Sequence, residues 1–216
     1  RFVSVARWFA EEEKRRRAEL RRVRSEIEGR LGITHSHGTL ELRARADRIE
    51  SDRNGGLVVV DYKTGTAPGG REVRLGLRPQ LVLEAMIARA GGFPGIDGSA
   101  IRDVEFWELK GGETPGRIAR PVPDAADAVD LALTGVQRLA EHFCDPATAY
   151  VPVPRPEIAP GFNDYDHLSR IDEWRGTEAD RFGRRVSGRG SRCGRSAALE
   201  YERRSCGDSR RRDSGP

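Results

Sequence analysis

The spacing of hydrophobic positions changes along the chain and predicts a succession of helices and strands. Near the start, apolar residues from Phe2 to Val23 recur at helical intervals, which predicts a helix over residues 2–24. Residues 39–46 then alternate between apolar and polar side chains, the pattern of a half-buried strand. Residues 57–60 are four consecutive apolar residues, which predicts a central strand covered on both faces.

Turns and loops separate the remaining predicted elements. Residues 52–56 read Asp-Arg-Asn-Gly-Gly and predict a tight turn, because Asn and Gly tolerate the positive φ that such turns need. The other elements are a glycine-rich loop over 65–76, a helix beginning near Pro79, a strand over 101–109, and a helix over 125–143 with Asp124 as its N-cap. This order predicts an α/β domain with a mixed sheet.

Composition narrows the class of protein. The 216 residues suffice for one well-packed domain, and 33% of them are charged, above the roughly 25% of an average soluble domain. No apolar run approaches the roughly 20 residues of a membrane-spanning helix, so we expect no membrane association. Three cysteines, Cys144, Cys193 and Cys206, are too few and too scattered for a disulfide framework, which favours a cytoplasmic location. The chain begins Arg1-Phe2, and we expect it to be a piece of a longer protein.

Positive charge is concentrated at the C-terminal end. Residues 175–216 hold 12 arginines and six acidic residues, a net charge of +6, whereas residues 1–174 carry −2. This end lacks apolar periodicity and is rich in Arg, Ser and Gly, so we expect a disordered tail over 175–216 after a folded domain over 1–174. The tail is either an arm that binds nucleic acid through phosphates or a non-native end of the chain.

Three charged residues give the central strands a candidate chemistry. Asp61 and Lys63 are two residues apart on a strand, so their side chains project from the same face. Antiparallel pairing across the preceding turn can bring Asp47 opposite Asp61, with Cβ atoms about 5 Å apart. Two such carboxylates repel each other unless a cation neutralises them, and Mg²⁺ suits two carboxylates plus phosphate oxygens. The competing interpretation is a surface salt bridge near a strand end.

Separate motifs, in a fixed order, carry a resemblance to a known family. They are Asp47-Arg-Ile-Glu50, Asp61-Tyr-Lys-Thr-Gly65, Pro79-Gln-Leu-Val-Leu-Glu-Ala85, and Asp164-Tyr-Asp-His-Leu-Ser-Arg170 before Trp174. The first two, with Gln80-Leu81, resemble the PD-(D/E)XK nucleases of the RecB type. The wider context over roughly residues 2–174 is similar to the C-terminal nuclease domain of the AddB family of double-strand break repair proteins.

The resemblance implies a fold and a set of site residues. The fold would be a restriction-endonuclease-like core, a central mixed β-sheet flanked by helices. Asp47 and Asp61 would ligate Mg²⁺, or Mn²⁺ in its place, with the Tyr62 carbonyl as a further ligand. Lys63 would position or activate the attacking water, and Gln80 would lie near the site in the first turn of its helix.

The chain departs from the family pattern at three points. Many RecB-type nucleases have Tyr four residues after the glutamine, where this chain has Glu84. The family also has an acidic or His ligand on a preceding helix, for which Glu26, Glu28 or a residue before Arg1 are candidates. Some AddB proteins hold an iron–sulfur cluster through clustered cysteines, and the cysteine spacing here predicts no such cluster.

The histidines carry weaker predictions. His35 and His37 flank Ser36 before a strand, where they either chelate a metal or are incidental loop residues. His167 lies in the segment 164–170, which we expect to pack against the domain.

These observations predict a Mg²⁺-dependent deoxyribonuclease domain. It would act on unwound or single-stranded DNA ends in double-strand break repair and recombination, beside an AddA-like helicase-nuclease subunit. No GxxxxGK[ST] loop for ATP is present in the chain itself. A catalytically inactive scaffold or DNA-guiding module of such a complex is the alternative. A basic nucleic-acid-binding protein is a third, which rests on the tail alone.

Overall fold

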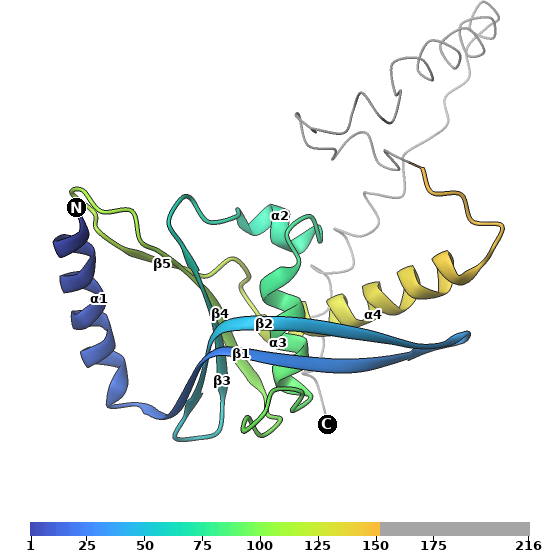
Figure 1. Cartoon of the computed structure of the whole chain (residues 1–216), viewed down its shortest axis with the longest axis horizontal. Helices are drawn as coiled ribbons and strands as arrows, with labels where there is room; N and C mark the ends of the chain where they lie inside the picture. The colour runs from blue at the N-terminus through green and yellow to red at the C-terminus, as the bar shows by residue number, and fades with distance from the viewer. Residues whose placement is uncertain (152–216) are drawn as a thin grey trace, which may run out of the picture. The chain divides into compact units, whose positions relative to one another are not determined.

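Five strands form one mixed sheet in the computed structural model, which describes residues 1–151 (Figure 1). The elements in chain order are α1 (Phe2–Arg17), β1 (Leu20–His35), β2 (Gly38–Asp52), β3 (Leu57–Lys63), α2 (Gly70–Arg74), α3 (Gln80–Arg89), β4 (Ile101–Glu108), β5 (Arg117–Ala119) and α4 (Ala125–Cys144). The strands lie in the order β1-β2-β3-β4-β5, with β3 and β4 parallel and the other neighbours antiparallel. The predicted α/β class with a central mixed sheet and flanking helices is confirmed.

The two faces of β3 pack against different helices because its side chains alternate. Leu57 and Val59 belong to the main core, which includes the buried face of α3. Val58 and Val60 belong to a second cluster with Trp107, against which Trp8 and Phe9 of α1 pack. The run of β-branched residues is therefore buried on both sides, as predicted, and β3 lies in the middle of the sheet.

A buried ion-pair network joins α1 to the sheet. The Arg16 guanidinium, 9% exposed, pairs with Glu50 of β2 and lies 2.7 Å from Glu105 of β4. Trp107 Nε1 donates to the same Glu105 carboxylate at 3.0 Å. Arg48 also pairs with Glu50, with a distance of 2.7 Å. Polar side chains therefore penetrate the apolar cluster under α1, where each charge has an opposite partner.

Strands β1 and β2 form a long hairpin that reaches beyond the rest of the sheet (Figure 1). Only residues 48–51 of β2 pair with β3, so most of the hairpin has no third strand beside it. This corrects the predicted helix over 2–24, which ends at Arg17. Leu20 and Val23 belong to β1 and not to the helical stripe. Both are partly buried in β1, whose pairing with β2 shifts in register between Leu20 and Arg22 and so breaks the regular alternation.

The other predicted elements differ in how well they match. The turn at 52–56 is confirmed: Asp52 N–H donates to Gly56 O at 2.9 Å, and Gly55 has a φ of 88°. The helices at Pro79 and 125–143 are confirmed as α3 and α4, with Asp124 accepting the Asp127 N–H at 3.0 Å. The glycine-rich loop contains the short helix α2, and neither it nor β5 was predicted.

Some predictions fall outside the described residues. They are the segment 164–170 with His167, the tail 175–216, and the cysteines Cys193 and Cys206. Within residues 1–151, no helix has the length and apolar character needed to cross a bilayer.

Candidate active site

The register of β2 and β3 brings two carboxylates to the same end of the sheet. Arg48 is the Cα partner of Val60, so one further step along the antiparallel ladder places Asp47 beside Asp61. The Asp47 carboxylate accepts the backbone N–H of Tyr62 at 3.0 Å, which holds it against the end of β3. Asp61 is 2% exposed, and Asp47 is half-buried. The two acids predicted as metal ligands therefore lie side by side, one buried and one reachable from solvent.

Lys63 forms an ion pair with Asp61 on the same face of β3. Its Nζ lies 2.7 Å from Asp61 Oδ2 and 5.8 Å from the centre of the Phe106 ring. Burial raises the pKa of the Asp61 carboxyl above its ordinary value, the Lys63 ammonium lowers it, and the Asp47 charge raises it again. Lys63 remains 32% exposed, so its ammonium is held by Asp61 and still open to a ligand.

The first turn of α3 completes the cluster. Gln80 Nε2 donates to Asp61 Oδ1 at 3.2 Å and to Glu84 Oε1 at 3.0 Å. One amide thereby joins a carboxylate of the sheet to a carboxylate of the helix. Pro79 precedes Gln80 at the N-cap and fixes where the helix begins, which sets the height of this amide above Asp61.

From the sequence, Glu84 was only a departure from the family pattern, and the structure adds it to the site. It is 1% exposed, and burial raises its pKa to about 7, with the Asp61 and Asp47 charges adding to the rise and Gln80 and Lys63 opposing it. The signal for it was present: a glutamate four residues after Gln80, in the otherwise apolar run of α3. Such a residue is one helical turn from Gln80 and must lie on the same side.

The oxygens of this cluster suit a divalent cation. Within residues 1–151, Asp61 Oδ2 and Glu84 Oε2 are buried side-chain oxygens with no hydrogen bond, although the former has its ion pair with Lys63. Mg²⁺ binds through one or two carboxylates and keeps waters for the rest of its shell. In the same residues, no three His, Cys, Asp or Glu side chains gather as a ready metal cage. Asp47 and Asp61 are the two carboxylates that fit Mg²⁺. The Gln80 amide links Asp61 to Glu84, which is a further carboxylate beside them.

Tyr62 lies in this region with its side chain on the other face of the sheet. Its ring packs against Phe9 and Trp107, with ring centres 5.9 and 5.8 Å away, and its hydroxyl accepts from Arg48 at 3.2 Å. Only its backbone faces Asp47, through the N–H described above. The predicted role of the Tyr62 carbonyl as a ligand stays a prediction.

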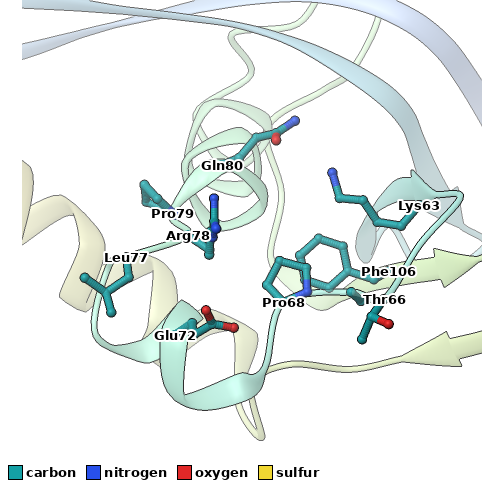
Figure 2. Close-up of a pocket in the computed structure, with 10 residues that line it drawn as sticks. Lys63, Thr66, Pro68, Glu72, Leu77, Arg78, Pro79, Gln80 and Phe106 are labelled. Carbon is teal, nitrogen blue, oxygen red and sulfur yellow. The ribbon is translucent and has the colours of Figure 1, made fainter. Parts of the chain in front are cut away.

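An open groove of about 630 Å³ adjoins Lys63 and Gln80. Figure 2 shows Lys63, Pro68 and Phe106 on one side of it and Arg78, Pro79 and Gln80 on the other. The remaining lining residues are Thr66, Ala67, Glu72 and Leu77. Both Lys63 and Gln80 line this groove, so a ligand bound in it would reach both.

The other candidates from the sequence lie on the β1–β2 hairpin. Glu26 and Glu28 belong to β1 and not to a helix, which corrects the predicted helical ligand; Glu26 is exposed and pairs with Arg45 at 2.7 Å. His35 and His37 lie at the hairpin turn, where His35 Nδ1 is 3.9 Å from Cys144 Sγ of α4. Within residues 1–151, no group of three His, Cys, Asp or Glu side chains could hold a metal ion, and this applies to His35, His37 and Cys144 as well.

Comparisons with known proteins show which family the chain resembles. Residues 1–155 match the sequence profile of the PD-(D/E)XK nuclease superfamily. Uncharacterized proteins of Rickettsia bellii and Rickettsia typhi are 36% and 35% identical over 78 residues, which are 36% of this chain and only 9% of each relative. The crystal structure of SSO0001 is 17% identical, with a TM-score of 0.33, and the match covers 59% of this chain and 57% of that one.

Proposed function

The chain belongs to the PD-(D/E)XK nuclease superfamily, and from this premise we propose that it is a Mg²⁺-dependent deoxyribonuclease that hydrolyses phosphodiester bonds. Its five-stranded mixed sheet with flanking helices is consistent with a restriction-endonuclease-like core. The observation that carries the proposal is the convergence of Asp47, Asp61, Lys63 and Gln80 where β3 ends and α3 begins.

Asp47 and Asp61 would hold the cation, Mg²⁺ or Mn²⁺, with the Tyr62 carbonyl as the further ligand that the resemblance implies. When bound, such an ion supplies Lewis-acid chemistry to a phosphate and its attacking water. The protein contributes a fixed arrangement: the Tyr62 N–H orients Asp47, and the Gln80 amide orients Asp61.

Lys63 would act on the phosphate and the water. Its ammonium lies at the mouth of the groove, beside the carboxylates that hold the cation, so it can position the attacking water and stabilise the negative charge that develops on phosphorus oxygens. Gln80 would act through Asp61 and Glu84, as a positioning residue.

The biological setting follows from the sequence motifs alone. We propose a cytoplasmic protein that processes unwound or single-stranded DNA ends in double-strand break repair, as part of an AddAB-like complex with an AddA-like helicase-nuclease partner. The support is the order of the motifs around Asp47, Asp61 and Gln80.

The test is degradation of end-labelled single-stranded DNA by the 216-residue chain, with Mg²⁺ or with EDTA. We expect Mg²⁺-dependent cleavage, and a loss of about a hundredfold or more in Lys63→Ala and in Asp61→Asn, because each removes charge from the reacting centre. Lys14→Ala is the matched control, since Lys14 is an exposed lysine on α1, which packs on the other face of the sheet.

Circular dichroism of each variant separates lost chemistry from lost folding. A folded wild-type chain that leaves DNA intact with Mg²⁺ and with Mn²⁺ contradicts the nuclease proposal. The inactive scaffold would then become the better explanation of this site.

A further inference from the structure

The groove beside Lys63 has a cationic side chain on each wall, Lys63 on one and Arg78 on the other (Figure 2). We propose that it binds the stretch of single-stranded DNA adjoining the cleaved phosphodiester, with the Arg78 guanidinium contacting a neighbouring phosphate. The inference rests on the proposed function, because it extends the same site outward from Lys63.

Arg78 is available for a ligand. It is exposed, and within residues 1–151 its side chain has no hydrogen bond and no ion pair. Two arginines at the nearby β5 end of the sheet differ: Arg117 and Arg120 are held by the buried carboxylates Glu108 and Glu105. A guanidinium without a partner, facing a groove, can give two parallel N–H donors to a phosphate.

The backbone holds Arg78 in place without using its side chain. The N–H groups of Leu77 and Arg78 donate to Glu72 O at 2.9 and 3.3 Å, which ties this loop to the end of α2. Pro79, the N-cap of α3, follows directly and restricts Arg78 further. The guanidinium therefore starts from a fixed point on the wall of the groove, which lowers the cost of ordering it on binding.

The charge of the groove suits a phosphate chain. Glu72, the acidic residue of the lining, already accepts the Gly69 N–H through its carboxylate at 2.9 Å, as the cap of α2. The first turn of α3 opens on the groove through Pro79 and Gln80, and its N-terminal dipole adds a partial positive charge beside the two cations. On the wall formed by Arg78 and the start of α3, these charges favour an anionic group.

The apolar part of the lining favours a single strand over a duplex. Leu77, 40% exposed, together with Pro68 and Pro79, offers apolar surface beside the cations. Unstacked bases can pack on such surface, whereas a duplex keeps its bases inside and presents only its backbone. The combination of cationic and apolar surface is what an exposed strand of nucleotides requires.

Binding is measured apart from cleavage, by fluorescence anisotropy of a labelled 12-nucleotide single strand with the 216-residue chain in EDTA. We expect Arg78→Ala to weaken binding about tenfold and to reduce the slope of log K against log salt by about 0.7, the value for one lost phosphate contact on a single strand. Arg53→Ala is the matched control: Arg53 is an exposed arginine in the turn before β3, at the opposite end of that strand from Lys63. Both variants keep the arginine-rich residues 175–216, so non-specific binding by that segment is common to them.

The outcomes separate the inference from the proposed function. Equal affinities for Arg78→Ala and Arg53→Ala overturn the inference, even if the wild type cleaves DNA. So does an equal loss of affinity for a single strand and for a duplex of the same length. A selective loss in Arg78→Ala supports the groove as a strand-binding site even if cleavage is never observed, and the nuclease proposal alone then fails.

Discussion

Glu84 and Glu108 are both 1% exposed, yet their pKa values are shifted in opposite directions. Glu108 is surrounded by donors: Arg117 at 2.7 Å, the Ala67 N–H at 2.7 Å and Lys110 at 3.1 Å, and these lower its pKa to about 2. Glu84 has one donor, Gln80, and lies near two other carboxylates, so burial raises its pKa to about 7. The partners of Glu108 therefore stabilise the fold, whereas Glu84 lacks such partners. A cation site needs carboxylates like Glu84, whose charge is not already neutralised by the protein.

Glu108 gives a pH-dependent prediction. Its pKa in the folded state, about 2, is below its ordinary value of 4.5, so its contribution to stability is complete above pH 4.5 and is lost as the pH falls toward 2. We expect Glu108→Gln to lower the free energy of unfolding by about 1–2 kcal/mol at pH 7. Urea denaturation at several pH values should show this difference shrink below pH 4.5. Glu113→Gln, an exposed glutamate in the β4–β5 loop, should change little at any pH, and a constant difference for Glu108→Gln would contradict the assignment.

At the scale of elements, the local sequence predicts a helix or strand well when the element's own hydrophobic pattern determines which of its faces is buried. The strand β3 and the helices α3 and α4 show their burial in the sequence, so they could be predicted with their ends nearly right. Strand β1 could not be predicted in this way, because arginines and glycines interrupt its apolar residues. Its burial depends on α3, α4 and the loop after α3. Gly29, for example, has no room for a Cβ beside Phe93, a contact that no local pattern shows.

The same limit applies to the site. Asp47, Asp61 and Lys63 could be placed together from strand alternation and one turn, and Gln80 from the resemblance. The contribution of Glu84 depends on how α3 lies against the sheet, which the sequence does not state. That the Arg78 side chain has no partner within residues 1–151 depends likewise on the path of the loop between α2 and α3.

Helix α1 offers a prediction at this scale, because one arginine holds it to two strands. Arg16→Met removes one partner from each of two buried carboxylates, while Glu50 keeps Arg48 and Glu105 keeps Arg120. We expect a loss of about 1.5–3 kcal/mol in the free energy of unfolding. Arg15→Met is the matched control on the preceding residue of α1: Arg15 is 69% exposed and pairs with Glu12, and such surface pairs contribute less than about 1 kcal/mol. Chemical denaturation of both variants measures the difference, and equal losses would show that the buried network does not stabilise α1.

For the whole molecule, the two faces of the sheet handle charge in different ways. Under α1, buried acids and arginines pair with one another, as Glu50 does with Arg16 and Arg48. On the α3 side, Asp61 pairs with Lys63, the Gln80 amide joins Asp61 to Glu84, and Asp47 accepts the Tyr62 N–H. Three carboxylates thus lie beside one ammonium, which leaves negative charge in excess. The sheet is thus stabilised by ion pairs on one face and carries a destabilising cluster on the other, and a divalent cation would relieve it.

This asymmetry predicts that divalent cations stabilise the protein and that substituting Asp61 abolishes this stabilisation. A cation that binds only the folded state adds stability as its concentration exceeds its dissociation constant, by about 2.7 kcal/mol at a hundredfold excess. We expect Mg²⁺ or Mn²⁺ to raise the melting temperature of the wild-type chain by several degrees over EDTA. Asp61→Asn should melt above the wild type in EDTA, because it removes a buried charge, and should gain nothing from either cation. Asp130→Asn, which removes an exposed carboxylate of α4 paired with Arg89, should keep the full response. If Asp61→Asn responds to Mg²⁺ as the wild type does, the cation binds elsewhere, and the excess negative charge at the end of β3 must have another role.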